Sequence, residues 1–149
     1  MKRLMMAIGL VWLPALADAH DFLAGDVAVG HPYISPTITS AMSGAGYFVL
    51  TNTGSEDDRL LDVEADFPRV MMHNSVVQDG VATMLPLDEG VIIPAGESIQ
   101  FAPSGMHVMF MGLGGDPFEV GEEIRATLTF ERGGKVDIVF FVEDFEHSH

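Results

Sequence analysis

Short runs of β-branched and aromatic residues recur along the chain, separated by glycine, proline, asparagine and aspartate. Such runs are typical of β-strands, and their close spacing is typical of a sandwich or barrel. No window of 12 or more residues after residue 19 has the apolar period of a helix, so the pattern predicts an all-β fold. We predict ten strands, at residues 26–34, 47–51, 60–66, 70–77, 81–85, 91–93, 98–101, 107–111, 123–131 and 136–142.

Two hairpins are indicated by their turn residues. The pairs Asp79-Gly80 and Gly133-Gly134 both suit tight turns, in which the two central residues need positive φ. Beside the second turn, apolar and polar residues alternate along residues 123–131. This alternation predicts a strand with one buried face and one solvated face.

The N-terminal segment has the organisation of a secretory signal peptide. Lys2 and Arg3 precede a nearly continuous apolar stretch at residues 4–16, and Ala17-Asp18-Ala19 has the small-x-small pattern of a cleavage site. The stretch is shorter than the roughly 20 residues that cross a membrane. We therefore expect a leader at residues 1–19, a single domain at 20–142, a short acidic and histidine-containing tail at 143–149, and export to the periplasm.

The composition excludes several classes of protein. With 7 basic and 22 acidic residues, the formal charge is −15, which argues against nucleic acid as a partner. The absence of cysteine excludes disulfide scaffolds, thiol redox enzymes, cysteine zinc sites, iron–sulfur proteins and blue-copper centres. The sequence also lacks the G-x-S-x-G and H-E-x-x-H motifs and a phosphate-binding loop, so we expect no enzymatic activity.

Methionine and histidine carry the candidate chemistry. Six of the seven methionines after residue 19 lie between positions 71 and 111, together with His73 and His107. Thioether sulfur is a soft ligand that favours Cu(I), and imidazole also suits copper. His107 and Met109 are two residues apart, so on a strand their side chains share a face. The cluster predicts a soft-metal site.

The Asp79-Gly80 turn brings a second pair into this site. If these two residues form the whole loop, His73 lies opposite Pro86 and Met84 is its diagonal neighbour on the same face, roughly 7–8 Å away. A slip of one residue would put His73 and Met84 on opposite faces. His31 is interpreted as a structural or surface residue. Met111 shares the strand parity of His107 and Met109, so it is also a candidate to line the site without binding the metal. Otherwise the five other methionines are interpreted as core-packing residues, since methionine often fills apolar interiors. These methionines are Met42, Met71, Met72, Met106 and Met111.

The spacing resembles that of the PCuAC family of periplasmic copper(I) chaperones. Their motif is His, ten residues, Met, twenty-one residues, then His-x-Met. Here ten residues separate His73 from Met84, and twenty-two separate Met84 from His107-Val108-Met109. We expect the extra residue in the turn at 88–90. The resemblance extends over residues 20–142 and includes the segments 46–61, 93–97, 105–113 and 128–134.

The resemblance implies a cupredoxin-like, Greek-key β-sandwich that binds Cu(I) through His73, Met84, His107 and Met109. It implies delivery of copper to a protein acceptor, such as a cytochrome c oxidase subunit or another copper chaperone, during assembly of the oxidase. We also expect a monomer with no membrane span after the leader. Two alternatives remain open: a copper-buffering or resistance protein that stores the metal, and a metal-free interaction module.

The termini hold further nitrogen donors. His20, which cleavage would make the N-terminal residue, and His147 and His149 are candidates for a secondary Cu(II) site, because nitrogen ligands suit that oxidation state. The alternative is a frayed terminus with no role in metal binding.

Overall fold

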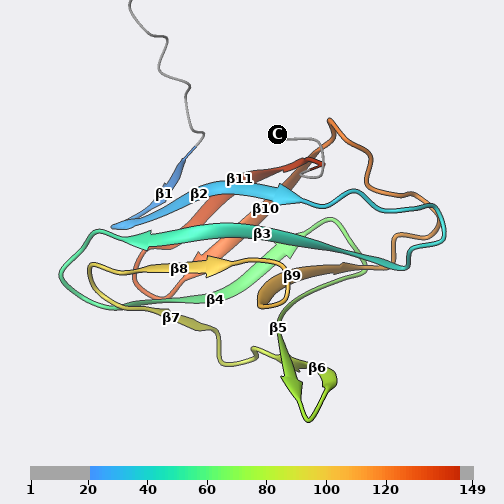
Figure 1. Cartoon of the computed structure of the whole chain (residues 1–149). Helices are drawn as coiled ribbons and strands as arrows, with labels where there is room; N and C mark the ends of the chain where they lie inside the picture. The colour runs from blue at the N-terminus through green and yellow to red at the C-terminus, as the bar shows by residue number, and fades with distance from the viewer. Residues whose placement is uncertain (1–20, 145–149) are drawn as a thin grey trace, which may run out of the picture.

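The computed structural model describes residues 21–144 (Figure 1). The expected leader at 1–19 and the candidate ligands His20, His147 and His149 lie outside the described residues. Residues 21–144 form eleven strands and no helix, so none of their segments is a helix able to span a membrane. The strands are β1 (Phe22–Ala24), β2 (Val27–Ile34), β3 (Ser43–Asn52), β4 (Asp58–Ala65), β5 (Arg69–Gln78), β6 (Val81–Pro86), β7 (Val91–Ile93), β8 (Ser98–Phe101), β9 (Met106–Met111), β10 (Glu123–Phe130) and β11 (Gly134–Val142).

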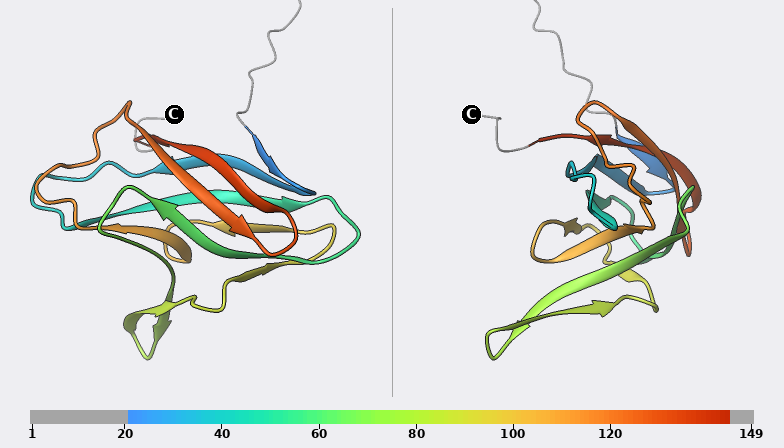
Figure 2. Two further views of the ribbon diagram at one scale, coloured as in Figure 1. Left: turned by 180° about the vertical axis from the view of Figure 1, so that it is seen from behind. Right: turned by 90° about the vertical axis from the view of Figure 1, so that its right-hand side faces the viewer.

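The strands belong to one hydrogen-bonded sheet that curls around a single core (Figures 1 and 2). Their order is β6-β5-β9-β3-β2-β11-β10-β4-β7, with β1 added to β2 and β8 added to β3. Strand β11 runs parallel to β2, whereas the other pairs are antiparallel. Strand β9 lies between β5 and β3, so long connections bring segments far apart in sequence side by side, as in Greek-key sandwiches.

Aromatic side chains fill the space between the two halves of the curled sheet. Phe110 of β9 and Phe48 of β3 both contact Phe140 of β11, with ring centroids 5.5 and 5.9 Å apart. Close packing leaves no room for a side chain at Gly46, where a Cβ atom would lie 2.9 Å from the Phe110 ring and 3.1 Å from the Phe140 ring. These contacts fix the position of β9 against the core.

The structure confirms the all-β prediction and all ten predicted strands. Strands β7 and β8 have the predicted bounds, and the others differ from the prediction by a few residues at one or both ends. The sequence did not indicate β1, which has only three residues. Strand β3 begins at Ser43, four residues earlier than predicted. The prediction missed this start because Gly44, Ala45 and Gly46 have low β propensity, and pairing with β9 holds them in the strand.

One of the two predicted tight turns is confirmed and the other is wrong. Asp79 and Gly80 have φ angles of 51° and 78° and form the two-residue loop between β5 and β6. In contrast, Phe130 pairs with Gly134, so the loop between β10 and β11 contains three residues. Of the two glycines predicted to form this turn, only Gly134 has positive φ, and it is the first residue of β11. Gly133 is required for a different reason: a Cβ atom there would lie 2.5 Å from the carbonyl oxygen of Ala24 in β1.

The hairpin of β5 and β6 extends away from the body of the domain (Figures 1 and 2). Strand β5 pairs with β9 along its first half, and β6 pairs with β5 alone, which makes it an edge strand. All six residues of β6 are exposed. The hairpin therefore has a base that is fixed to the sheet and an outer strand that is open to solvent.

Candidate metal site

Two buried histidines face each other at the base of this hairpin. His73 on β5 lies directly opposite His107 on β9, and their ring centroids are 5.8 Å apart with an angle of 56° between the planes. His73 is 9% exposed and His107 is 4% exposed. Imidazoles at such low exposure normally have hydrogen-bond partners for their nitrogens.

Each of these imidazoles has a buried nitrogen without a partner. The Nδ1 atom of His107 lies 3.1 Å from the carbonyl oxygen of Gly105. Because a carbonyl oxygen only accepts, Nδ1 carries the proton and Nε2 has a free lone pair. That Nε2 atom and the Nδ1 atom of His73 are both buried and form no hydrogen bond. Unpartnered buried polar atoms destabilise a fold, and a bound metal ion would satisfy both of them.

The surroundings favour the neutral form of His73. Burial lowers the pKa of His73 below its usual 6.5, and the neighbouring His107 and Arg69 lower it further. Asp88, in the connection that follows β6, acts in the opposite direction. A neutral imidazole is the form that coordinates a metal. His73 is therefore in the form that could coordinate a metal at neutral pH.

Two methionines complete the set of candidate ligands on the same face. Met109 follows His107 by two positions on β9, so both side chains project from one face. Ser75 pairs with Met84 and His73 pairs with Pro86, which confirms the predicted register and makes Met84 the diagonal neighbour of His73. Met84 is 54% exposed. Within residues 21–144, no three histidine, aspartate or glutamate side chains gather to hold a metal, so a metal here would need the sulfur atoms.

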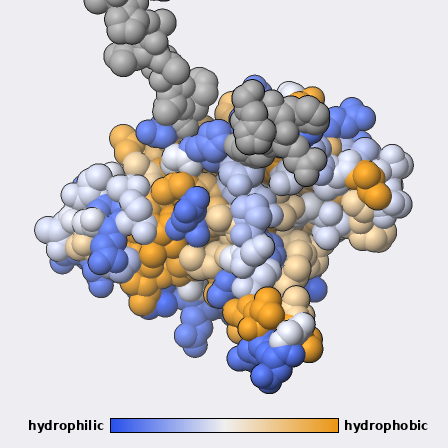
Figure 3. All heavy atoms as spheres, viewed as in Figure 1, coloured by the Kyte–Doolittle hydropathy of each residue, from blue (hydrophilic) through white to orange (hydrophobic). Residues whose placement is uncertain are grey.

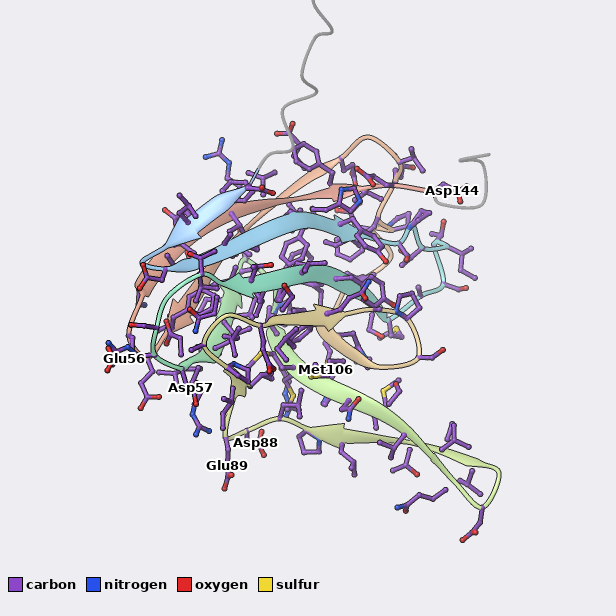
Figure 4. All side chains as sticks on the ribbon, turned by 60° about the vertical axis from the view of Figure 1, so that its left-hand side comes forward. Glu56, Asp57, Asp88, Glu89, Met106 and Asp144 are labelled. Carbon is purple, nitrogen blue, oxygen red and sulfur yellow. The ribbon has the colours of Figure 1, made fainter. Side chains whose placement is uncertain are left out.

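The site lies where the hairpin leaves the domain. Figure 4 labels Met106 at the start of β9, close to the base of the hairpin, and Asp88 in the connection after β6. The outer part of the hairpin carries exposed apolar side chains, visible as orange atoms at the lower end of the molecule in Figure 3. They are Val77, Val81, Met84 and Leu85.

Comparison with known proteins assigns the chain to a family. The model of the LpqE-like family, described as "Putative lipoprotein LpqE-like", matches residues 27–142. This is the PCuAC family. The chain belongs to it. A curated relative, "Putative lipoprotein Lxx21020" of Leifsonia xyli subsp. xyli (strain CTCB07), is 33% identical over an alignment of 142 residues that covers 93% of this chain and 82% of the relative.

Solved PCuAC structures confirm the cupredoxin-like fold. The apo PCuAC domain from PmoF1 superimposes with a TM-score of 0.69 at 24% identity, covering 83% of this chain and 98% of that domain. The copper-bound PCuAC domain from PmoF2 has a TM-score of 0.67 at 26% identity, covering 83% and 97%. The cupredoxin-like architecture expected from the sequence is therefore that of this chain.

The remaining methionines of this PCuAC domain differ in their environments. Met72 is 7% exposed in the core and Met106 packs against the core, as predicted. The prediction for Met42 was wrong, since it is 71% exposed. Met71 and Met111 are partly exposed and lie on the face of His73 and His107, so neither is a core residue; for Met111, the structure agrees with the alternative that it shares the face of His107 and Met109. Applying the two-residue period of the strand to Met71 would have shown this, because it precedes His73 by two positions.

His31 is a surface residue, in agreement with its interpretation from the sequence. Its Nε2 atom lies 3.2 Å from Oε2 of Glu143, and its ring centroid lies 5.4 Å from that of Tyr33. Its φ angle of 47° lies in the left-handed region, at a register shift between β2 and β3. Such a bulge redirects side chains at the margin of a sheet.

Proposed function

We propose that the protein is an exported copper chaperone that binds Cu(I) through His73, Met84, His107 and Met109 and delivers it to a protein acceptor. One observation carries the proposal: two opposed, buried imidazoles have unpartnered nitrogens on a face that also bears the thioethers of Met84 and Met109. The copper-bound PmoF2 domain, which has the same fold and 26% identity, supports the choice of metal.

The chemistry of the four side chains favours Cu(I) over Cu(II). Thioether sulfur is a soft donor, and neither thioethers nor neutral imidazoles bring negative charge to offset a divalent ion. Because the pKa of His73 is lowered, that ligand needs no deprotonation at neutral pH. Because the proposed ligands include no thiol, Cu(I) binding releases no thiol protons, and the charge of His73 does not change.

Differences in exposure among the ligands suit transfer of the ion. The two histidines are buried on paired strands, whereas Met84 is 54% exposed on the edge strand β6. An acceptor's ligand can approach the ion from the side of Met84 and replace it first. We place this transfer in the periplasm, with a cytochrome c oxidase subunit or another copper chaperone as acceptor. This role is that of a carrier rather than of an enzyme.

Metal binding is tested by loading the purified protein with Cu(I) under anaerobic conditions and measuring the copper retained after desalting. We expect one equivalent in the wild type and a large loss in a Met84→Leu/Met109→Leu variant. Met42→Leu is the matched control, because Met42 is exposed outside the site. Equal copper retention in the wild type and the double variant would show that the site is wrongly assigned. A parallel titration with Cu(II) tests the preferred oxidation state.

Delivery is tested separately from binding. The copper-loaded protein is mixed with the apo copper-binding domain of a cytochrome c oxidase subunit, and copper is measured on each protein after separation. The proposal predicts transfer faster than the spontaneous release measured with a Cu(I) chelator. Copper that stays bound in the presence of acceptors would contradict delivery and support storage.

A further inference from the structure

Met71 lies in the same block of side chains as three of the proposed ligands. Along the pairing of β5 with β9, Met71 is directly opposite Met109, and His73 is directly opposite His107. Directly opposed residues in an antiparallel pair have Cβ atoms roughly 4.5–5.5 Å apart, and positions i and i+2 share a face. The four side chains thus form two adjacent cross-strand pairs on one face.

Packing in the core does not account for Met71. The side chain that β5 contributes to the core at this level is that of Met72, which is 7% exposed and points to the opposite face. Met71 is partly exposed and does not belong to the core cluster. Met111 also shares the site face, but it pairs with Arg69 and so lies two rows away from the histidines. Met71 is therefore the thioether outside the family motif that is placed to reach the site.

The position of Met84 is different. Strand β6 pairs only with β5, and each of its residues is exposed. Met84 is thus held at the open margin of the site, whereas Met71 and Met109 belong to strands paired inside the sheet. If Met84 dissociates, the thioether of Met71 on β5 still lies beside the pair of histidines.

We propose that Met71 is an additional Cu(I) ligand, which replaces Met84 in the coordination of the ion when Met84 dissociates from it, before a ligand of the acceptor binds. This inference rests on the proposed function. In the exchange, the bond from copper to the sulfur of Met84 breaks and a bond to the sulfur of Met71 forms. Both thioethers are neutral, so the charge and oxidation state of the ion do not change. The ion is then held by two histidines and two methionines on β5 and β9 alone.

The test uses NMR of the protein with [¹³C]methyl-labelled methionine, titrated with Cu(I) under anaerobic conditions. In a Met84→Leu variant, we expect the methyl signals of Met71 and Met109 to shift together. The signals of Met42 and Met72 serve as internal references, because one is exposed outside the site and the other is in the core. A Met71 signal that does not move in this variant would overturn the proposal.

Cu(I) competition titrations provide a second readout. Met71→Leu alone should lower the Cu(I) affinity about threefold or less. In Met71→Leu/Met84→Leu, the loss of Cu(I) affinity should be at least about tenfold greater than the product of the losses in the two single variants, since each residue substitutes for the other. Methionine-to-leucine changes conserve volume and should leave the fold intact. If the double variant binds as well as Met84→Leu, the inference about Met71 fails while the proposed function stands. If the wild type binds no Cu(I), both fail.

Discussion

The same substitution should change the stability of the protein by very different amounts at two consecutive methionines on β5. Met72 is 7% exposed in the core, whereas Met71 is partly exposed on the site face. Truncating a buried methionine to alanine removes apolar contacts and leaves a cavity, at a cost of about 2–5 kcal/mol. Truncating a partly exposed methionine that leaves no cavity should cost about 0.5 kcal/mol. We therefore expect Met72→Ala to be strongly destabilising and Met71→Ala to be nearly neutral in stability.

In a chain of this size, the loss at Met72 corresponds to a fall in Tm of roughly 8–20 °C, and that at Met71 to about 2 °C. The only tryptophan, Trp12, lies in the predicted leader, so unfolding is best followed by circular dichroism. Urea denaturation of the apo protein gives the two free energies directly, and Met42→Ala provides an exposed control. Equal destabilisation at positions 71 and 72 would refute the reasoning, because it would mean that β5 does not present opposite faces as described.

Three further predictions concern stability. The buried carboxylate of Asp58 accepts three backbone N–H groups, so Asp58→Ala should lower the free energy of unfolding by about 3–5 kcal/mol in urea; a loss below about 1 kcal/mol would contradict this role. The pKa of His73 is lower in the folded protein than in the unfolded chain. As the pH falls below 6.5, His73 is therefore protonated in the unfolded chain before it is protonated in the folded protein, and the free energy of unfolding decreases. The wild type should thus lose more stability between about pH 7 and pH 5 than His73→Gln does; equal losses would count against the shift. Gly80→Ala should cost about 1–2 kcal/mol in urea denaturation, from its φ of 78° alone, since no atom lies within 4 Å of the new Cβ; a neutral effect would contradict the turn conformation.

Local rules were sufficient for the parts of the site that depend on one hairpin or one strand. The Asp79-Gly80 turn fixed the register of β5 against β6 and so placed His73 and Met84 on one face. The two-residue period placed His107 and Met109 together in the same way. Each inference needed only the turn chemistry and the alternation of the strand.

Features that depend on long-range pairing were not accessible from one sequence. The direct opposition of His73 and His107 results from pairing between β5 and β9, which are separated by three other strands in the chain. No local pattern specifies this register or the burial of both rings. The role of Gly133 was missed for the same reason, because it depends on the approach of β1 to the last hairpin.

The methionines show where a compositional argument is insufficient. Treating methionine as a core residue was correct for Met72 and wrong for Met42, which lies in an exposed loop. For Met71, the necessary signal was present in the sequence as its spacing of two residues from His73. Residue type suggested packing, whereas position on the strand indicated the site face.

The most direct test of the central claim is a competition titration of Cu(I) against a chromophoric Cu(I) chelator. It compares the purified protein with a His107→Ala/Met109→Leu variant and with Met42→Leu as the control. The account predicts one tightly bound equivalent in the wild type and in the control, and its loss in the double variant. Binding of equal affinity in the double variant, or no tight binding in the wild type, would contradict it.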